Sequence, residues 1–392
     1  MILLCFKTIN RLTEGIMTFK NISRRVLIVI LSTFYVLITL FNVIVLFFCS
    51  LRFTDNRQQI NHLDDLQEYY ETTPSSEIAA EQSFVSFDID FNDLRLNEIK
   101  MVASHNSYKK QGTALGRAMI ALGSSKEDAR LMNYGNVWIS EQLDAGIRSI
   151  EIDLRYKNGS FVTTHVPLVD NRSVCPDFSL LLEELKLWSD NHPNHIPIII
   201  ILELKSDWMV LDPTLDDIGQ SELEMLNDML LFNFDSAIYT PEMLKGSYNS
   251  LQERIATESW PYVSDLLGKF IFVLHPGEFT DTYVSLFPDY EGMSLFPAVS
   301  NLDTDHGYVA FVVHNDPNIE EINALVAQNY IVRTRMDEDL VNDPDRMADA
   351  IASGAQILTT DLHPATQIQN ATPIYLDGNY TVIVNDITHE DE

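Results

Sequence analysis

The chain has 392 residues, 46% of them hydrophobic, and a formal net charge of −31. This length allows one large domain or two ordinary ones. The acidic balance excludes a general nucleic-acid surface, because it would repel phosphate backbones, and it disfavours simple adsorption to anionic lipid. It is compatible with binding a divalent cation, and nothing in the composition indicates an obligate protein partner.

The first predicted element is an uncharged apolar run, residues 26–51. A bilayer-spanning helix takes about 20 apolar residues, and a cleaved signal peptide has a core of only roughly 7–15. We therefore expect a transmembrane signal anchor, with a secreted, cleaved form as the alternative. Basic residues dominate the preceding segment, residues 1–25, which places that segment in the cytosol and the body in the lumen or outside. Sequons in the body agree with this route and predict a glycoprotein: Asn158, Asn171, Asn370 and Asn379.

Three further segments are expected after the anchor. Residues 52–92 are polar and acidic and predict a stalk that holds the body off the membrane. The body, residues 93–366, alternates strand-like and helical patterns, and an acidic tail that we expect to be loose, residues 367–392, follows it. This alternation predicts an α/β fold, a TIM-like (β/α)8 barrel. The eight predicted strands are Ile99–Ser104, Ile147–Arg155, Phe161–His165, Pro197–Lys205, Phe270–His275, Val309–His314, Tyr330–Asp337 and Gln356–Asp361.

Polar side chains gather at the ends of four of these apolar runs. Residues two apart on a strand share a face, so paired polar residues at a strand end project together. A core built from such charges would be costly, because buried charges need a partner or a metal. We therefore expect a site at these strand ends, where Asp361, after the last strand, could orient another group. The four clusters are His105 with Asn106, Glu151 with Asp153, His165, and Glu203 with Lys205.

The residue types in these clusters indicate two kinds of chemistry. Amide and carboxylate oxygens suit a hard cation, calcium or magnesium, rather than zinc. Two histidines beside such a cation can act as the acid and the base of a phosphodiester cleavage, because imidazole titrates near working pH. Lys205 and one of the two arginines in Val-Arg-Thr-Arg, Arg333 or Arg335, could hold a phosphate or a hydroxyl.

The order of the motifs resembles one known family. ASHNSY, QLDAGIRSIEIDLR, a strand-end histidine and HPNHIPIIIILELK occur in sequence, and VRTRMD and ASGAQILTTD follow them. Together they resemble the calcium-dependent phosphoinositide-specific phospholipase C family of bacterial and fungal type, over roughly residues 94–364. The resemblance implies a TIM-like barrel, distorted or incompletely closed. It also implies cleavage of phosphatidylinositol or a related inositol phospholipid to diacylglycerol and a cyclic inositol phosphate.

The same resemblance implies roles for individual residues. His105 and His165 correspond to the acid–base pair. Lys205 and Arg335 correspond to substrate-binding residues. The ligands of Ca²⁺ correspond to Asn106, Glu151, Asp153 and Glu203.

Two other functions fit parts of the pattern. Glycerophosphodiester phosphodiesterases share the barrel, the Glu-x-Asp pair, a strand-end histidine and Glu-x-Lys, but they typically have His-Arg-Gly where this chain has His105-Asn106-Ser107. Because Asn106 offers an oxygen ligand and an arginine does not, the phospholipase is favoured. A catalytically inactive lipid-binding barrel is the second alternative, and the intact histidine pair argues against it.

Overall fold

The computed structural model describes residues 24–78, 83–86 and 89–389. The chain forms two compact units, residues 1–50 and 51–392, and the boundary falls within helix α2, Arg24–Thr72. In the first unit the described residues are helical, and α2 contains an exposed window that is apolar and long enough to cross a membrane. The basic segment expected at the N-terminus lies outside the described residues up to residue 23.

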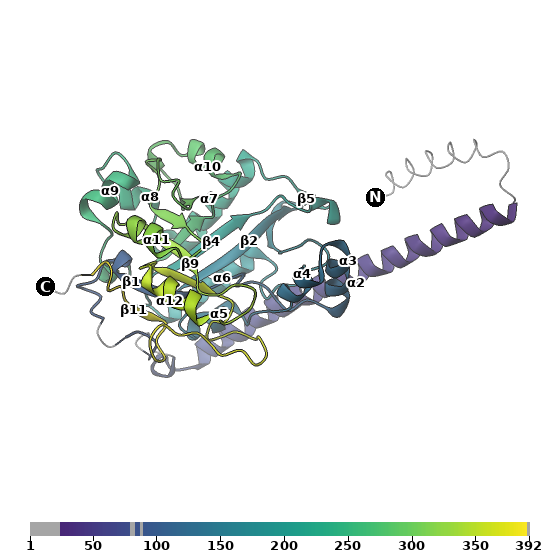
Figure 1. The fold of residues 1–392 in the computed structure, drawn as a ribbon, viewed down its shortest axis with the longest axis horizontal. Helices are drawn as coiled ribbons and strands as arrows, with labels where there is room; N and C mark the ends of the chain where they lie inside the picture. The colour runs from purple at the N-terminus through teal and green to yellow at the C-terminus, as the bar shows by residue number, and fades with distance from the viewer. Residues whose placement is uncertain (1–23, 79–82, 87–88, 390–392) are drawn as a thin grey trace. The chain divides into compact units, whose positions relative to one another are not determined.

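The second unit is built around a TIM-like barrel, as expected, and the strand pairing closes the ring, whereas the family resemblance implied a distorted or incompletely closed barrel (Figure 1). Eight parallel strands form it within the described residues, and each pairs with the next around the ring until β10 pairs with β1. The pairing between β1 and β2, which completes the ring, is short, because these two strands share only two residue pairs. The barrel strands are β1 (Ile99–Ser104), β2 (Ser149–Lys157), β4 (Ile198–Leu204), β6 (Phe270–Leu274), β7 (Leu295–Ser300), β8 (Phe311–Val313), β9 (Ile331–Arg335) and β10 (Ile357–Thr360).

Helices surround this barrel (Figure 1). In α6 (Phe178–Asn191), the buried residues Leu181, Leu185 and Trp188 recur at helical spacing, and the Asp177 side chain caps the helix by accepting from the backbone of Ser179. Besides α6 and the end of α2, the α-helices of this unit that the structure describes are α3 (Ala114–Gly123), α4 (Lys126–Leu131), α5 (Ile139–Asp144), α7 (Gln220–Phe234), α8 (Pro241–Lys245), α9 (Leu251–Glu258), α10 (Thr280–Leu286), α11 (Ile319–Val326) and α12 (Pro344–Ala352).

One predicted barrel strand is wrong, and one barrel strand was not predicted. The run from Phe161 forms β3 (Ser160–Thr163), which is antiparallel to β2 and lies outside the ring. The hairpin turn between them is Asn158-Gly159, both at positive φ, the pair that a two-residue turn favours. The eighth barrel strand is instead β7, whose short run contains Pro297.

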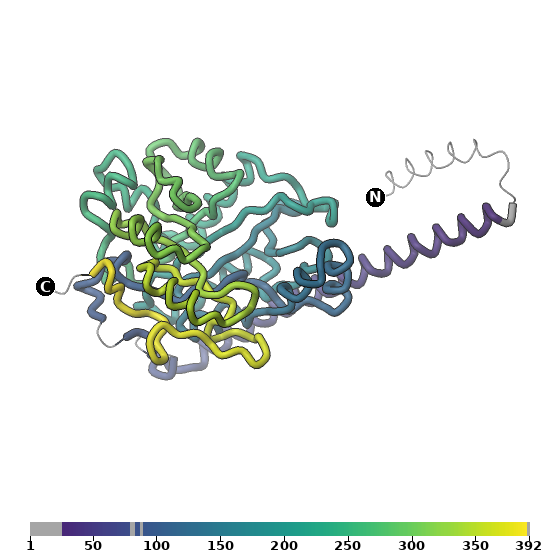
Figure 2. The backbone as a smooth tube through the Cα atoms, viewed as in Figure 1, coloured from purple at the N-terminus to yellow at the C-terminus, as the bar shows by residue number. Residues whose placement is uncertain are grey.

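Two segments differ from the stalk and the loose tail expected from their composition. Residues 51–72 continue α2, and several of their side chains are buried against the barrel. After the barrel, β11 (Val382–Val384) pairs antiparallel with the start of β1, and Figure 2 traces this C-terminal chain in yellow. A further short strand, β5 (Leu215–Asp216), pairs with the far end of β2.

Candidate active site

Polar side chains converge at the carboxyl ends of the barrel strands, the end at which TIM barrels carry their sites. His165 reaches this end from β3, the antiparallel arm of the β2–β3 hairpin, and not from a strand of the barrel. The barrel strands supply the rest: His105 and Asn106 follow β1, Glu151 and Asp153 lie on β2, Glu203 and Lys205 lie at the end of β4, Arg333 and Arg335 lie on β9, and Asp361 follows β10.

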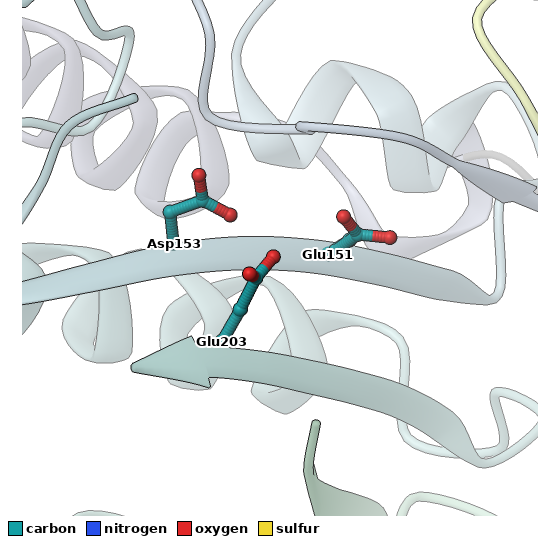
Figure 3. Close-up of side chains that lie close together, drawn as sticks. All are labelled: Glu151, Asp153 and Glu203. Carbon is teal, nitrogen blue, oxygen red and sulfur yellow. The ribbon is translucent and has the colours of Figure 1, made fainter. Parts of the chain in front are cut away.

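Three acids on neighbouring strands form one cluster (Figure 3). Asp153 on β2 is in register with Glu203 on β4. Glu151 precedes Asp153 by two residues and therefore lies on the same face of β2. In Figure 3 the Glu203 carboxylate reaches up between the other two side chains. One oxygen from each of the three lies within 4.8 Å of the others. Three carboxylates this close repel one another unless a positive charge lies among them.

The donor set of this cluster fits a hard cation. Oδ1 of Asp153 is buried and has no hydrogen-bond partner among the described residues, while Oδ2 lies 2.8 Å from the Tyr108 hydroxyl. The same hydroxyl lies 3.3 Å from Oδ1 of Asn106, which brings the amide oxygen to the cluster. Lys205 contacts two of the acids, with Nζ 3.3 Å from Asp153 Oδ2 and 3.0 Å from Glu203 Oε1. An oxygen-only set with an unsatisfied buried carboxylate oxygen is the chemistry that calcium requires.

Arg333 fixes the charge of Glu151. Its guanidinium donates to Oε2 of Glu151 and, 3.0 Å away, to the hydroxyl of Thr359. Burial alone would raise the pKa of Glu151, but Arg333 first and His105 next hold that pKa down at about 2. Glu151 is therefore ionised at any working pH.

His105 is held by a buried carboxylate. Its Nδ1 lies 2.8 Å from Oδ1 of Asp361, whose second oxygen accepts from Arg335, also at 2.8 Å. Although burial opposes ionisation, His105 and Arg335 keep the pKa of Asp361 at about 2. The other ring nitrogen, Nε2, points toward the acid cluster and lies 3.7 Å from Glu151 Oε1. The amide nitrogen of Asn106 lies 3.3 Å from Nε2, so this ring nitrogen accepts a weak contact in the structure and is the one that can exchange a proton with a bound group.

His165 has a matching arrangement. Its Nδ1 lies 3.3 Å from Oδ2 of Asp170, and the Lys109 ammonium lies 2.9 Å from the same carboxylate oxygen. Lys109 and the hydrogen bond with His165 outweigh burial and lower the pKa of Asp170. Arg155 donates to the backbone carbonyl of His165 at 3.0 Å. Each histidine therefore has its own ionised carboxylate, and each carboxylate has its own cation.

Two cavities of about 240 Å³ each open at this end of the barrel. The first is lined by both histidines, His105 and His165, and by Arg335, whereas Arg333 is turned to Glu151 and does not line it. The second is lined by Lys205 and by His275, which follows β6. The structure thus brings the predicted site residues to one end of the barrel. It also distinguishes the two arginines, because Arg333 pairs with Glu151 and Arg335 pairs with Asp361 at the cavity of the two histidines.

Several site residues escaped sequence reasoning. Asp170 lies in a loop five residues after His165, and Lys109 lies four residues after His105, so neither ends a strand-like run. Tyr108 and Tyr134 are buried aromatics whose hydroxyls lie within hydrogen-bond distance of Asp153 and Asn106, respectively. The tyrosine of the Ser-His-Asn-Ser-Tyr run was the one available signal, because a tyrosine buried beside polar neighbours needs a partner for its hydroxyl.

Cleavage of a phosphodiester requires proton transfer beside a cation-binding centre. A TIM-like barrel that combines a histidine pair with a cluster of acids in this way belongs among the phosphoric diester hydrolases. The comparisons with known proteins specify the family. The family described as "Phosphoinositide phospholipase C, Ca2+-dependent" matches residues 94–161 and 155–385. The chain belongs to this family, whose cation is Ca²⁺. The comparison with curated proteins gives no match.

Solved structures of bacterial enzymes share the fold. A calcium-dependent phosphoinositol-specific phospholipase C from Pseudomonas sp is 21% identical, covers 76% of this chain and 97% of its own, and gives a TM-score of 0.55. A Ca²⁺-dependent phosphatidylinositol-specific phospholipase C from Streptomyces antibioticus is 19% identical, covers 68% and 94% respectively, and gives a TM-score of 0.50. At these identities the likeness shows the fold alone, and the roles of the site residues rest on the geometry described above.

Proposed function

We propose that this chain is a calcium-dependent phosphodiesterase that cleaves phosphatidylinositol or a related inositol phospholipid to diacylglycerol and a cyclic inositol phosphate. The observation that carries the proposal is the pair of histidines in one cavity, each backed by its own carboxylate, Asp361 for His105 and Asp170 for His165. Such a pair can accept a proton from one side of a phosphorus atom and return one on the other.

His105 is the base and His165 the acid in this proposal. The 2-hydroxyl oxygen of the inositol ring bonds to phosphorus while Nε2 of His105, which points toward the acid cluster, takes the hydroxyl proton. The bond from phosphorus to the diacylglycerol oxygen breaks, and His165 gives that oxygen a proton. The two carboxylates accept from Nδ1 of each ring, which leaves Nε2 unprotonated on the base.

Asn106, Glu151, Asp153 and Glu203 would hold Ca²⁺. When bound, Ca²⁺ lowers the pKa of a hydroxyl and offsets the charge that grows on the phosphate. The unpartnered Oδ1 of Asp153 supports the assignment, because a buried carboxylate oxygen without a donor calls for a cation.

Lys205 and Arg335 would bind the substrate. Lys205 lies beside the acids in one cavity, and Arg335 lies with the two histidines in the other, so together they can span a phosphate and a ring hydroxyl. An arginine presents a planar fork that matches phosphate oxygens, while a lysine acts as a point charge.

An inositol headgroup is the favoured substrate chemistry. One of the matched Pseudomonas structures is a myoinositol complex. Against a glycerophosphodiesterase stands Asn106, whose oxygen is linked to Asp153 through Tyr108 at a position where the rival pattern has an arginine. Against an inactive barrel stands the complete histidine–carboxylate pairing.

The apolar part of α2 would anchor the protein in a membrane, with the barrel on the lumenal or extracellular side. The excess of basic residues before the apolar run supports this orientation. The sequon asparagines Asn158, Asn370 and Asn379 are exposed and open to glycosylation, whereas Oδ1 of Asn171 is buried. Glycosidase treatment of the native protein tests the topology, and a shift in mobility is expected.

The function is tested with the purified full chain in mixed micelles containing labelled phosphatidylinositol, with calcium and with a chelator. We expect calcium-dependent release of diacylglycerol and a cyclic inositol phosphate, lost in His105→Ala and Glu151→Gln. Turnover of glycerophosphoinositol but not of the lipid would move the assignment to the glycerophosphodiesterases. Calcium-dependent lipid binding without any product would leave the inactive barrel.

A further inference from the structure

The part of α2 that belongs to the barrel unit, residues 51–72, is called the docked helix here. It presents a polar stripe to the barrel, with Arg52, Asp55, Gln59 and His62 spaced three, four and three residues apart and therefore on one face. Asp55 and Gln59 are 0% and 1% exposed, so the stripe is a contact surface. In the view of Figure 1 this helix passes behind α5, where His62 meets Ser140 at 3.0 Å.

The first residue of the stripe holds the chain on both sides of His165. The Arg52 guanidinium donates to the carbonyl of Thr163 at 2.8 Å, to that of Asn171 at 2.9 Å and to that of Pro176 at 2.7 Å. Thr163 ends β3 two residues before His165, and the other two carbonyls lie in the loop that follows it. One side chain thus ties both ends of the segment that carries the histidine and Asp170.

The second residue of the stripe joins this segment to the loop after β1. Oδ1 and Oδ2 of Asp55 accept a two-pronged contact from Arg172, at 2.7 Å and 3.1 Å, and Lys110 lies 3.0 Å from Oδ1. The carboxylate is fully buried between a residue of the His165 loop and a residue that follows His105 by five positions. Two cations meet there on a single acid, so loss of its charge leaves both of them repelling each other.

The contact continues to the catalytic imidazole through the backbone. Lys109 and Ser173 form an antiparallel bridge directly beside Lys110 and Arg172, and the Lys110 amide donates to the Arg172 carbonyl. Lys109 then pairs with Asp170, and Asp170 with Nδ1 of His165. Asp55 is therefore linked to the His165 ring by its ion pairs with Lys110 and Arg172, by the backbone bridge beside them, by the Lys109–Asp170 salt bridge and by the hydrogen bond between Asp170 and His165.

We propose that Arg52 and Asp55 are positioning residues for His165, so that the docked helix is part of the support of the active site. This inference rests on the proposed function. Gln59 and His62 serve attachment only, because they contact Asp177 at the start of α6, Ser140 of α5 and Glu184 of α6, none of which touches either histidine. Within the described part of the chain, the hydrogen bonds and ion pairs of the acid cluster on β2 and β4 involve no residue of the stripe, so we expect calcium affinity to be unaffected by changes to the stripe.

The proposal separates two quantities that a general loss of stability would move together. In the full chain in mixed micelles, Asp55→Asn and Arg52→Gln are expected to lower kcat on phosphatidylinositol by about 10- to 100-fold, because small misplacements of a catalytic group have costs of this order. KM and the calcium Kd stay unchanged. The limb of the pH–kcat profile that belongs to His165 shifts, and Asp55→Glu restores part of the rate.

Matched controls come from the exposed side of the same helix. Asp64→Asn and Arg57→Gln make the same chemical changes at exposed positions of the docked helix and are expected to retain wild-type kcat. Should Asp55→Asn fail to fold, Arg52→Gln carries the test, because it removes contacts to neutral carbonyls and leaves no buried charge unpaired. A kcat equal to that of the controls in a folded variant overturns the inference, as does a fall in kcat matched by an equal fall in calcium affinity. An inactive wild type is a different result, since it overturns the proposed function and the inference with it.

Discussion

The contact between His105 and Asp361 offers the sharpest test of the proposed acid–base chemistry. Asp361→Asn keeps the shape of the side chain but replaces an ionised acceptor with an amide. The carboxylate is 3% exposed and has a pKa of about 2, so it carries its full charge wherever the enzyme works. The amide can present its NH₂ to Nδ1 of His105, which favours the ring tautomer with the proton on Nε2 and removes the base.

The magnitude follows from the contacts that change. A hydrogen bond to a charged group is worth about 1.5–3 kcal/mol, which is about 10- to 150-fold in rate. Loss of the correct tautomer removes general base catalysis itself, typically worth about 10²- to 10⁴-fold. We expect kcat to fall by about 10³-fold, within that range. The fold should persist, because Arg335 keeps Asp337 at 3.5 Å and lies at the open cavity.

The assay is the initial rate of diacylglycerol release as a function of pH, with calcium binding measured by calorimetry on the same samples. Asp339→Asn is the matched control, because Asp339 lines the same cavity, is exposed and touches neither histidine. Calcium affinity should be unchanged in both variants. A folded Asp361→Asn enzyme with a kcat within about threefold of wild type, a change of well under 1 kcal/mol, would refute the assignment of His105 as a base oriented by Asp361.

Three further outcomes follow from individual residues. Asp153→Asn should weaken calcium binding by at least about tenfold in calorimetry, because it removes a charged oxygen from the cluster, and an unchanged Kd would exclude Asp153 as a ligand. His363 is fully buried, and burial lowers its pKa from 6.5 to about 4, so the unfolded chain binds its proton first and stability is lost as pH falls from 6.5 toward 4. The loss is at most about 3 kcal/mol. In denaturant titrations at several pH values, the unfolding free energy of His363→Asn should fall less steeply between pH 6.5 and 4 than that of the wild type, and an equally steep fall would contradict the linkage. Gly159→Ala should destabilise the β2–β3 hairpin by about 1–2 kcal/mol in the same titrations, because φ is +86° there while no atom crowds the new methyl, and a neutral result would contradict that account.

The barrel was predictable where strands are apolar and end in polar residues. In β4, five successive residues from Ile198 to Leu202 are buried, and a run of this kind fits only a strand covered on both faces. The two errors in the strand assignment arose where the residue pattern does not show in which direction a strand runs or hides the strand altogether. The run after Gly159 reads as a strand whether it is parallel or antiparallel, and only the Asn-Gly turn before it distinguishes the two. β7 was not predicted because it contains Pro297, and proline, which lacks a backbone donor, argues against a strand inside a sheet.

The docked helix was not predictable from hydropathy. Its contact face is polar, with Asp55 and Gln59 as its most buried members before Tyr70, so a helical pattern of apolar residues never appears. A stripe of acid and amide side chains looks the same in sequence whether it faces water or a matching set of cations. The partners of this stripe, Lys110 and Arg172, lie more than fifty residues away, and only the fold brings them together.

The site shows the same division. Glu151 and Asp153 were predictable because alternation along a strand places them together, and the register of β2 with β4 adds Glu203. Asp170 was not, because its contact with His165 depends on the course of a loop. Residues that project from regular elements can be placed from spacing alone, whereas those that orient them from loops cannot.

The two histidines share a design that bears on how activity should vary with pH. Each Nδ1 meets a carboxylate, and each carboxylate meets a second cation, Arg335 on one side and Lys109 on the other. Against the effect of burial, His105 and then Arg335 lower the pKa of Asp361, and Lys109 and then His165 lower that of Asp170, so neither carboxylate titrates where the enzyme works. An imidazole that gains or loses its proton therefore does so against a fixed negative charge, and only Nε2 changes state. The two limbs of a pH–rate profile should accordingly report the two imidazoles and not the carboxylates behind them. Two histidines can act as base and acid in one cavity only if each exchanges its own proton at Nε2 while its carboxylate stays charged.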